Sequence, residues 1–127
     1  MGKKVDDIVL DGALNEIRNN CTLMTVCSGE PVDFAAANVG GAAFLADVVM
    51  ATGDFVLSDG DVSGRKIAVS AKSGVNVDNS GTADHVALLD TVNSRLLYVT
   101  TCTSLGLTAG SSLTFGAWDI EIADPSQ

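Results

Sequence analysis

The stretch His85-Val-Ala-Leu-Leu-Asp-Thr-Val-Asn-Ser-Arg-Leu-Leu-Tyr-Val-Thr-Thr-Cys102 contains two apolar, strand-forming runs on either side of a short polar loop. The runs cover residues 85–89 and 96–102, and the loop covers residues 90–94. Two such runs joined by turn-forming residues are typical of a β-hairpin. This stretch therefore predicts that the chain folds around antiparallel β structure.

Shorter runs of the same kind lie on both sides of the hairpin. The clearest is Trp118-Asp-Ile-Glu-Ile122, in which apolar and acidic residues alternate as they do in a strand with one wet face. Strands that recur about every ten residues, with turns between them, are typical of an antiparallel sandwich or barrel. The other expected strands are residues 22–27, 42–50, 55–57, 66–71, 75–77, 105–108 and 113–115, with a short helical turn within 33–39.

The N-terminal segment predicts the only substantial helix, over residues 6–19. Asp6 or Asp7 can cap its first turn, and four apolar residues recur at helical spacing on one face. We therefore expect a mainly β protein, an antiparallel β-sandwich or barrel with one N-terminal α-helix. A chain of 127 residues suits one domain, 1–127, with the helix at about 6–19 and a β-rich body at about 21–122. The four apolar helix residues are Leu10, Ala13, Leu14 and Ile17.

The composition limits the possible partners. Seven Lys and Arg against sixteen Asp and Glu give a net charge of -9, which disfavours binding to nucleic acid. No apolar run is long enough to cross a membrane, and no export signal opens the chain, so we expect synthesis in the cytoplasm. Apolar residues make up 46% of the chain, more than a domain of this size can easily bury, which predicts contacts between subunits.

The chain has three cysteines, Cys21, Cys27 and Cys102, without a C-x-x-C pair. In a protein made in the cytoplasm, cysteines of this kind usually behave as small core residues. We expect all three to be reduced and buried.

Three groups of residues could carry chemistry. Residues 59–64, Asp-Gly-Asp-Val-Ser-Gly, resemble the start of a calcium loop, but Ser70 stands where the loop needs a glutamate, so we expect a plain turn. His85 has no recognisable nucleophile motif beside it. Asp119 and Glu121 share one face of a strand and could act as paired carboxylates, although an exposed strand face is the simpler interpretation. We expect no catalytic residue, no metal, no cofactor and no enzymatic activity.

Several longer stretches resemble a family of small structural proteins from the virions of tailed bacteriophages. They include Val9-Leu-Asp-Gly-Ala-Leu14, Cys21-Thr-Leu-Met-Thr-Val-Cys-Ser28 and Arg95-Leu-Leu-Tyr-Val-Thr-Thr-Cys102. Gly53-Asp-Phe55, residues 59–66, Gly81-Thr-Ala-Asp-His-Val-Ala-Leu88, Leu107-Thr-Ala-Gly110 and Ala117-Trp-Asp-Ile-Glu-Ile122 complete the resemblance. It implies a virion component and supplies no catalytic residues.

Three functions compete on this basis. The first is a capsid decoration (cement) protein that binds the major capsid protein on the outer capsid surface, most simply as a trimer, with the helix at 6–19 or the tail after Ile122 as its docking arm. The second is a structural component of the phage neck, tail or head fibre. The third is a small hydrolase that acts on carbohydrate through its carboxylates.

Overall fold

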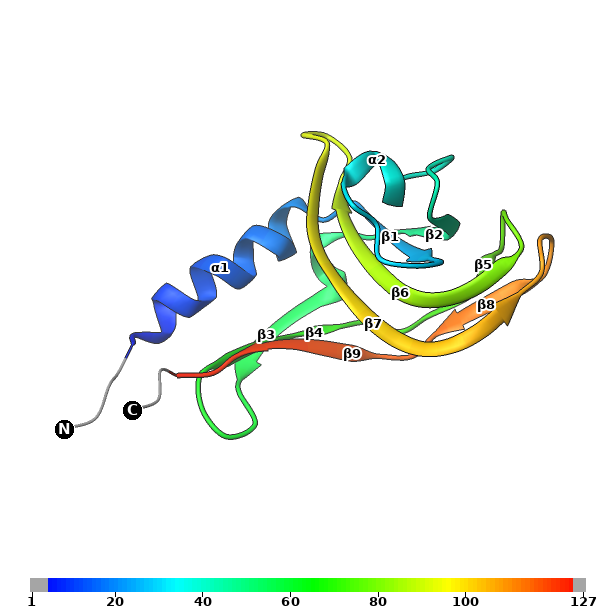
Figure 1. Ribbon diagram of the computed structural model, residues 1–127. Helices are drawn as coiled ribbons and strands as arrows, with labels where there is room; N and C mark the ends of the chain where they lie inside the picture. Colours follow the sequence, from blue (N-terminus) through cyan, green and yellow to red (C-terminus); the bar gives the residue numbers. More distant parts are fainter. Residues whose placement is uncertain (1–4, 125–127) are drawn as a thin grey trace.

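The structure, a computed structural model, describes residues 5–124 and consists mainly of antiparallel strands (Figure 1). The predicted mainly β fold with one N-terminal helix is confirmed. No helix among the described residues is long and apolar enough to span a membrane. The elements are α1 (Asp7–Asn20), β1 (Leu23–Cys27), α2 (Phe34–Ala37), β2 (Phe44–Val49), the 3-10 turn η1 (Thr52–Asp54), β3 (Phe55–Asp59), β4 (Arg65–Val69), β5 (Lys72–Asn76), β6 (Gly81–Asp90), β7 (Arg95–Leu107), β8 (Ser112–Phe115) and β9 (Trp118–Ile122).

The strands form two packed layers that are joined along one side. One layer is a four-stranded sheet in the order β2-β1-β6-β7. The other consists of the sheet β3-β4-β9 and the pair β5-β8, in which β4 leads into β5 and β8 leads into β9. A bridge between Ala46 and Val77 connects the layers beside β2. The molecule is thus a sandwich whose layers are bridged beside β2, whereas β7 pairs with no strand of the second layer among the described residues.

Alternation along the strands places one apolar face of each layer in a shared core. On β1, Met24 and Val26 face this core, while Leu23 and Cys27 face a second, smaller cluster beneath α2. All five residues of β1 are consequently buried. The main core joins the four-stranded sheet to the second layer through Met24, Val26, Val86 and Leu88 on one side and Ile67, Val69, Val75, Leu113, Phe115 and Ile120 on the other.

Helix α1 begins where the sequence predicts, because the Asp6 side chain accepts a hydrogen bond from the Ile8 amide at 3.0 Å. Leu10 and Leu14 are buried, and Ile17 packs against the main core. The expectation that Ala13 belongs to the buried face is wrong, because Ala13 is exposed. The helix rests on β4 and the neighbouring β3 and η1 along one narrow side, so its buried stripe is narrower than the apolar spacing indicates.

The central hairpin is longer than the sequence predicts. Strand β6 begins at Gly81, and residues 105–107, expected as part of a separate strand, form the end of β7. Register shifts between Ala83 and His85, and between Leu88 and Leu89, interrupt the simple alternation while the pairing continues. Strand β5 similarly begins at Lys72, before the expected strand at 75–77, and continues through Gly74, where a φ of +66° and a register shift mark a bulge.

The loop between β6 and β7 is fixed by the buried Asp90. Its carboxylate accepts hydrogen bonds from the Val92 amide at 3.0 Å, the Asn93 amide at 3.1 Å and the Asn93 side-chain Nδ2 at 2.8 Å. These bonds favour the charged form, and the Asn93 side chain in particular holds the pKa of Asp90 below its usual value.

The lowered pKa predicts how Asp90 contributes to stability. A carboxylate with a depressed folded pKa stabilises the fold above its unfolded pKa of about 4, and this contribution is lost as the pH falls through the folded pKa. Denaturant titrations should therefore show that Asp90→Asn lowers the free energy of unfolding at pH 7, and that the gap to the wild type narrows toward pH 3. Glu16→Gln is the control, because the exposed Glu16 side chain makes no hydrogen bond among the described residues. A constant gap between pH 7 and pH 3 would contradict this role.

Candidate functional site: an open groove between β7 and β8–β9

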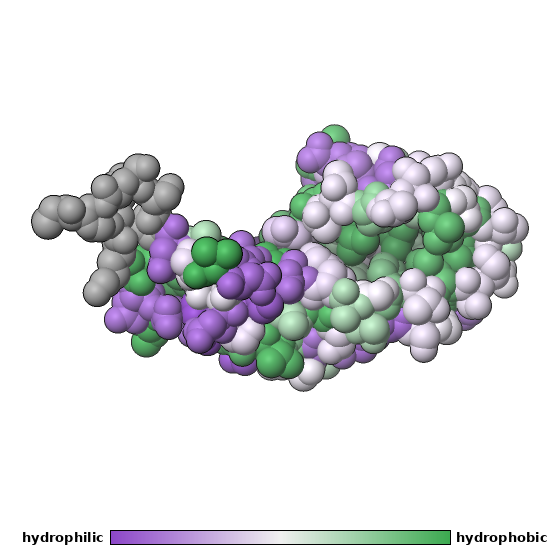
Figure 2. All heavy atoms as spheres, turned by 90° about the horizontal axis from the view of Figure 1, so that it is seen from below, coloured by the Kyte–Doolittle hydropathy of each residue, from purple (hydrophilic) through white to green (hydrophobic). Residues whose placement is uncertain are grey.

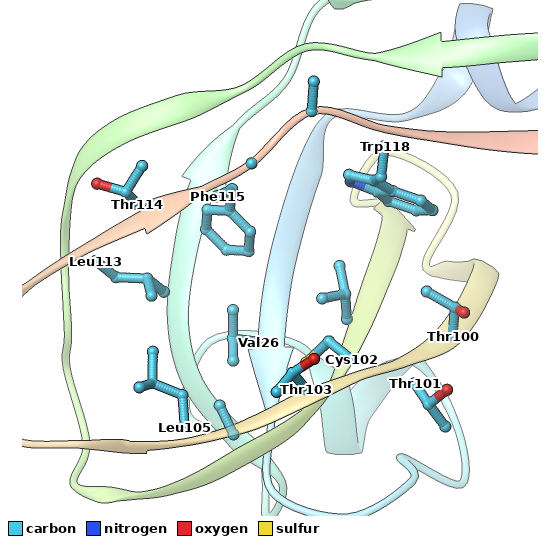
Figure 3. A pocket seen from close by; sticks show the side chains of 14 residues that line it. Val26, Thr100, Thr101, Cys102, Thr103, Leu105, Leu113, Thr114, Phe115 and Trp118 are labelled. Carbon is cyan, nitrogen blue, oxygen red and sulfur yellow. The ribbon is translucent and has the colours of Figure 1, made fainter.

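The open side of the sandwich contains a cavity of about 540 Å³ (Figure 3). Strand β7 forms one wall and pairs only with β6, whereas β8 and β9 form the facing wall and pair with β5 and β4. Within residues 5–124, no backbone hydrogen bond joins β7 to β8 or β9. The groove is therefore bordered by two strand edges. Its lining residues are Val26, Ala83, Val86, residues 100–103, Leu105 and residues 113–118.

One end of the groove is spanned by aromatic side chains. The rings of Tyr98 on β7 and Trp118 on β9 stack with their centroids 6.1 Å apart and an interplanar angle of 28°. The Trp118 Nε1 atom is buried and has no hydrogen-bond partner among the described residues. A buried donor without an acceptor is costly.

The groove is uncharged, in contrast to the opposite end of the molecule. Residues 96–118, which include both long walls, contain no Asp, Glu, Lys, Arg or His. Figure 2 shows a hollow with hydrophobic residues inside and mostly pale residues around it, while most hydrophilic residues of this face gather toward its other end and a smaller hydrophilic group lies above the hollow. Several ion pairs lie outside the groove lining: Arg65 with Asp11 and Asp59, Lys66 with Asp61 and Asp119, and Lys72 with Asp54.

The β7 wall lacks the usual protection of a strand edge. Residues 101–106 are exposed, and Leu105 keeps 52% of its surface accessible. Edge strands in soluble proteins normally carry a charged residue or proline that prevents pairing with other chains. Neither occurs between Leu96 and Leu107. This edge is thus chemically competent to pair with another strand.

His85 lies outside the groove lining and is held by its neighbour. Its Nδ1 atom lies 2.8 Å from the Asp84 carboxylate, which also accepts a hydrogen bond from the Gly29 amide at 2.7 Å. The hydrogen bond with His85 has the largest effect in lowering the pKa of Asp84, and the bond from Gly29 lowers it further. The hydrogen bond from the Gly29 amide anchors the turn after β1 to β6, and Gly29 has a φ of +80° in this turn.

Residues 59–64 form the turn between β3 and β4, as the sequence predicts. The carboxylates of Asp59 and Asp61 pair with Arg65 and Lys66 at 2.7 Å. Gly64 has a φ of +74°, and a Cβ atom there would meet the Ile122 carbonyl oxygen at 1.9 Å, so the turn requires glycine. Among the described residues, no group of three or more His, Cys, Asp or Glu side chains is arranged to hold a metal ion.

Asp119 and Glu121 both lie on the exposed face of β9, as expected, and each has a separate partner. Asp119 lies 3.6 Å from the Lys66 ammonium, and Glu121 accepts a hydrogen bond from the Asp61 amide at 3.1 Å. Both carboxylates thus support the β3–β4 turn. The structure does not bring either of them to the groove.

The expectation that all three cysteines are buried is wrong for Cys102. Cys21 and Cys27 are buried, and burial raises the pKa of Cys21 to about 11 and also raises that of Cys27. Cys102 is exposed and lines the groove from β7. Its position on an unpaired edge, rather than in a doubly packed strand such as β1, explains the difference. All three thiols are free.

Sequence reasoning did not identify the groove. The absence of charge over residues 96–118 is a readable signal, but it does not indicate that β7 and β8–β9 face each other without pairing. Comparison with known proteins adds no relative: no family model, curated protein or solved structure matches the chain.

The exposure of Cys102 predicts a simple pattern of thiol modification. Iodoacetamide applied to the native protein at pH 8.5 should modify one thiol, because only Cys102 is accessible, and peptide mapping should locate it. In denaturant without reductant, intact mass should show three modified thiols. A single modified thiol in denaturant would reveal a disulfide and contradict the free cysteines.

Proposed function

We propose that this protein decorates the outer surface of a bacteriophage capsid, where it binds the major capsid protein and stabilises the head. The observation that carries the proposal is the uncharged groove with its unpaired strand edge, a surface suited to binding protein segments. The resemblance to small virion proteins supports the same role. A protein of this kind contributes mechanically, through binding energy, rather than through catalysis.

A second surface supports a role in assembly. The N-terminal half of α1 extends from the β body (Figure 1) and exposes an apolar strip of Ile8, Val9, Gly12 and Ala13. Ile8 and Val9 are 75% and 61% exposed. Exposed apolar residues grouped on one helix face are typical of a protein contact. The strip favours α1 as a docking arm; the tail beyond Asp124 lies outside the described residues.

The charge distribution fits the exterior of a shell. A net charge of -9 would oppose contact with packaged DNA, which the inner wall of a capsid faces. Because the acidic residues lie mainly away from the groove, docking through the groove would leave them in solvent. Two separated contacts on each copy would also add their binding energies, so many individually weak contacts could hold the shell together.

We also propose that the protein associates with itself, with a trimer as the favoured state. The large apolar fraction and the exposed strip on α1 support this proposal, and closed cyclic symmetry is the usual arrangement of identical subunits. Analytical ultracentrifugation at micromolar concentration should give a mass near three times that of the monomer. A monomeric mass would reject self-association in solution.

Deletion of the gene is the direct test of capsid decoration. Because a ligand that binds only the assembled shell stabilises it by mass action, mutant particles should release DNA at a lower temperature than wild-type particles. Cryo-EM should show density missing from the outer capsid surface, and adding back the purified protein should restore both the density and the melting temperature.

Two results would contradict this function. Density missing from the neck, tail or a head fibre, with the shell unchanged in appearance and melting, would support the alternative virion role. A hydrolytic activity that falls at least about a hundredfold in Asp119→Asn would support an enzyme, since a loss of that size is typical when a catalytic acid or base is removed.

A further inference from the structure

We infer that the groove receives one extended, uncharged segment of the shell protein, which adds a strand between β7 and β8–β9. This inference rests on the proposed capsid-decorating function and specifies the chemistry of the docking partner. It arises from the groove's two strand edges and its lack of charge.

The walls of the groove favour an extended backbone as the occupant. Along β7, backbone N–H and C=O groups on the side away from β6 have no partner in β8 or β9 within residues 5–124. Strand edges of this kind are satisfied by another strand, whose own backbone groups recur at the same spacing. A compact small molecule could fill about 540 Å³ but could not pair with a row of backbone groups.

The lining defines the side chains that the occupant can carry. Thr100, Cys102 and Leu105 on one wall face Leu113, Phe115 and Trp118 on the other (Figure 3). A charged side chain placed among them would lose its hydration without gaining a partner. Small or β-branched neutral residues suit these walls.

A second copy of this chain fits the groove less well. The N-terminal residues before α1 include Lys3, Lys4 and Asp6, and the segment after β9 includes Asp124 and Pro125. The charged side chains of these segments are incompatible with the uncharged lining, and proline lacks the amide N–H that strand pairing needs. The β7 edge of another copy belongs to a whole sheet. In the groove that this sheet would have to enter, β8–β9 face β7 across a cavity and not across open solvent. A single strand can enter where a sheet cannot.

Cys102 provides a direct test, because it is the one exposed cysteine and lines the groove. Purified heads carrying the protein and the free protein would be treated with iodoacetamide under the same native conditions. We expect alkylation of Cys102 to be at least about tenfold slower on the heads, because an inserted strand covers the thiol. Hydrogen exchange of the peptides covering residues 99–106 should slow in parallel, since strand addition protects edge amides.

A charge variant separates strand insertion from nonspecific covering. Leu105→Lys places a cation at an exposed groove position and should weaken binding to heads at least about tenfold without changing the melting temperature of the free protein. Val62→Lys is the matched control: Val62 is 96% exposed in the β3–β4 turn, far from the groove lining, and its variant should bind normally. If Leu105→Lys impairs folding, Thr103→Lys at another exposed lining position replaces it.

A benzophenone maleimide attached to Cys102 identifies the occupant. On illuminated heads, a crosslink to the shell protein is expected, within a segment free of charged residues. Crosslinking to another copy of this chain, or Cys102 reactivity on heads equal to that of the free protein, would overturn the inference while leaving capsid decoration intact. Absence of the protein from purified heads would overturn both.

Discussion

The pairing of β6 with β7 is the interaction on which the rest of the structure depends. Strand β6 is also the partner of β1, so the four-stranded sheet is assembled around it. Asp90 fixes the connecting loop, and the pairing continues from Asp90 and Arg95 to Gly81 and Leu107. Two register shifts along this ladder increase its local twist and bend. The curved hairpin provides the concave face on which the second layer packs.

The open groove follows from the same hairpin. On the β2 side, the bridge between Ala46 and Val77 and the hydrogen bonds of Asp78 and Asn79 to the Leu45 carbonyl hold the two layers together. On the β7 side, β8 and β9 take their hydrogen bonds from β5 and β4, so β7 receives none from them. The stacked rings of Tyr98 and Trp118 span this gap.

Local patterns predict the elements of this fold better than they predict its surfaces. Asp6 and the helical spacing locate α1 to within one residue, and the alternation of Trp118 to Ile122 gives the bounds of β9. The exposure of Ala13 and Cys102 depends instead on which neighbours the topology supplies, which a single sequence does not specify. The groove escapes prediction for the same reason, because it requires knowing that two nearby strands face each other without pairing.

An exposed uncharged edge would ordinarily be an aggregation hazard, and the shape of this molecule offers a way to limit that hazard without charge. Protection by lysine or proline would also block a strand-binding groove, because both prevent pairing from either direction. Here β8 and β9 face the β7 edge, so another chain can reach this edge only through the cavity. The acidic residues, most of which lie away from the groove, give each copy a net charge of -9, which disfavours nonspecific association. Shape and distant charge can thereby restrict the edge to single extended segments, while the edge itself keeps the uncharged chemistry that pairing needs.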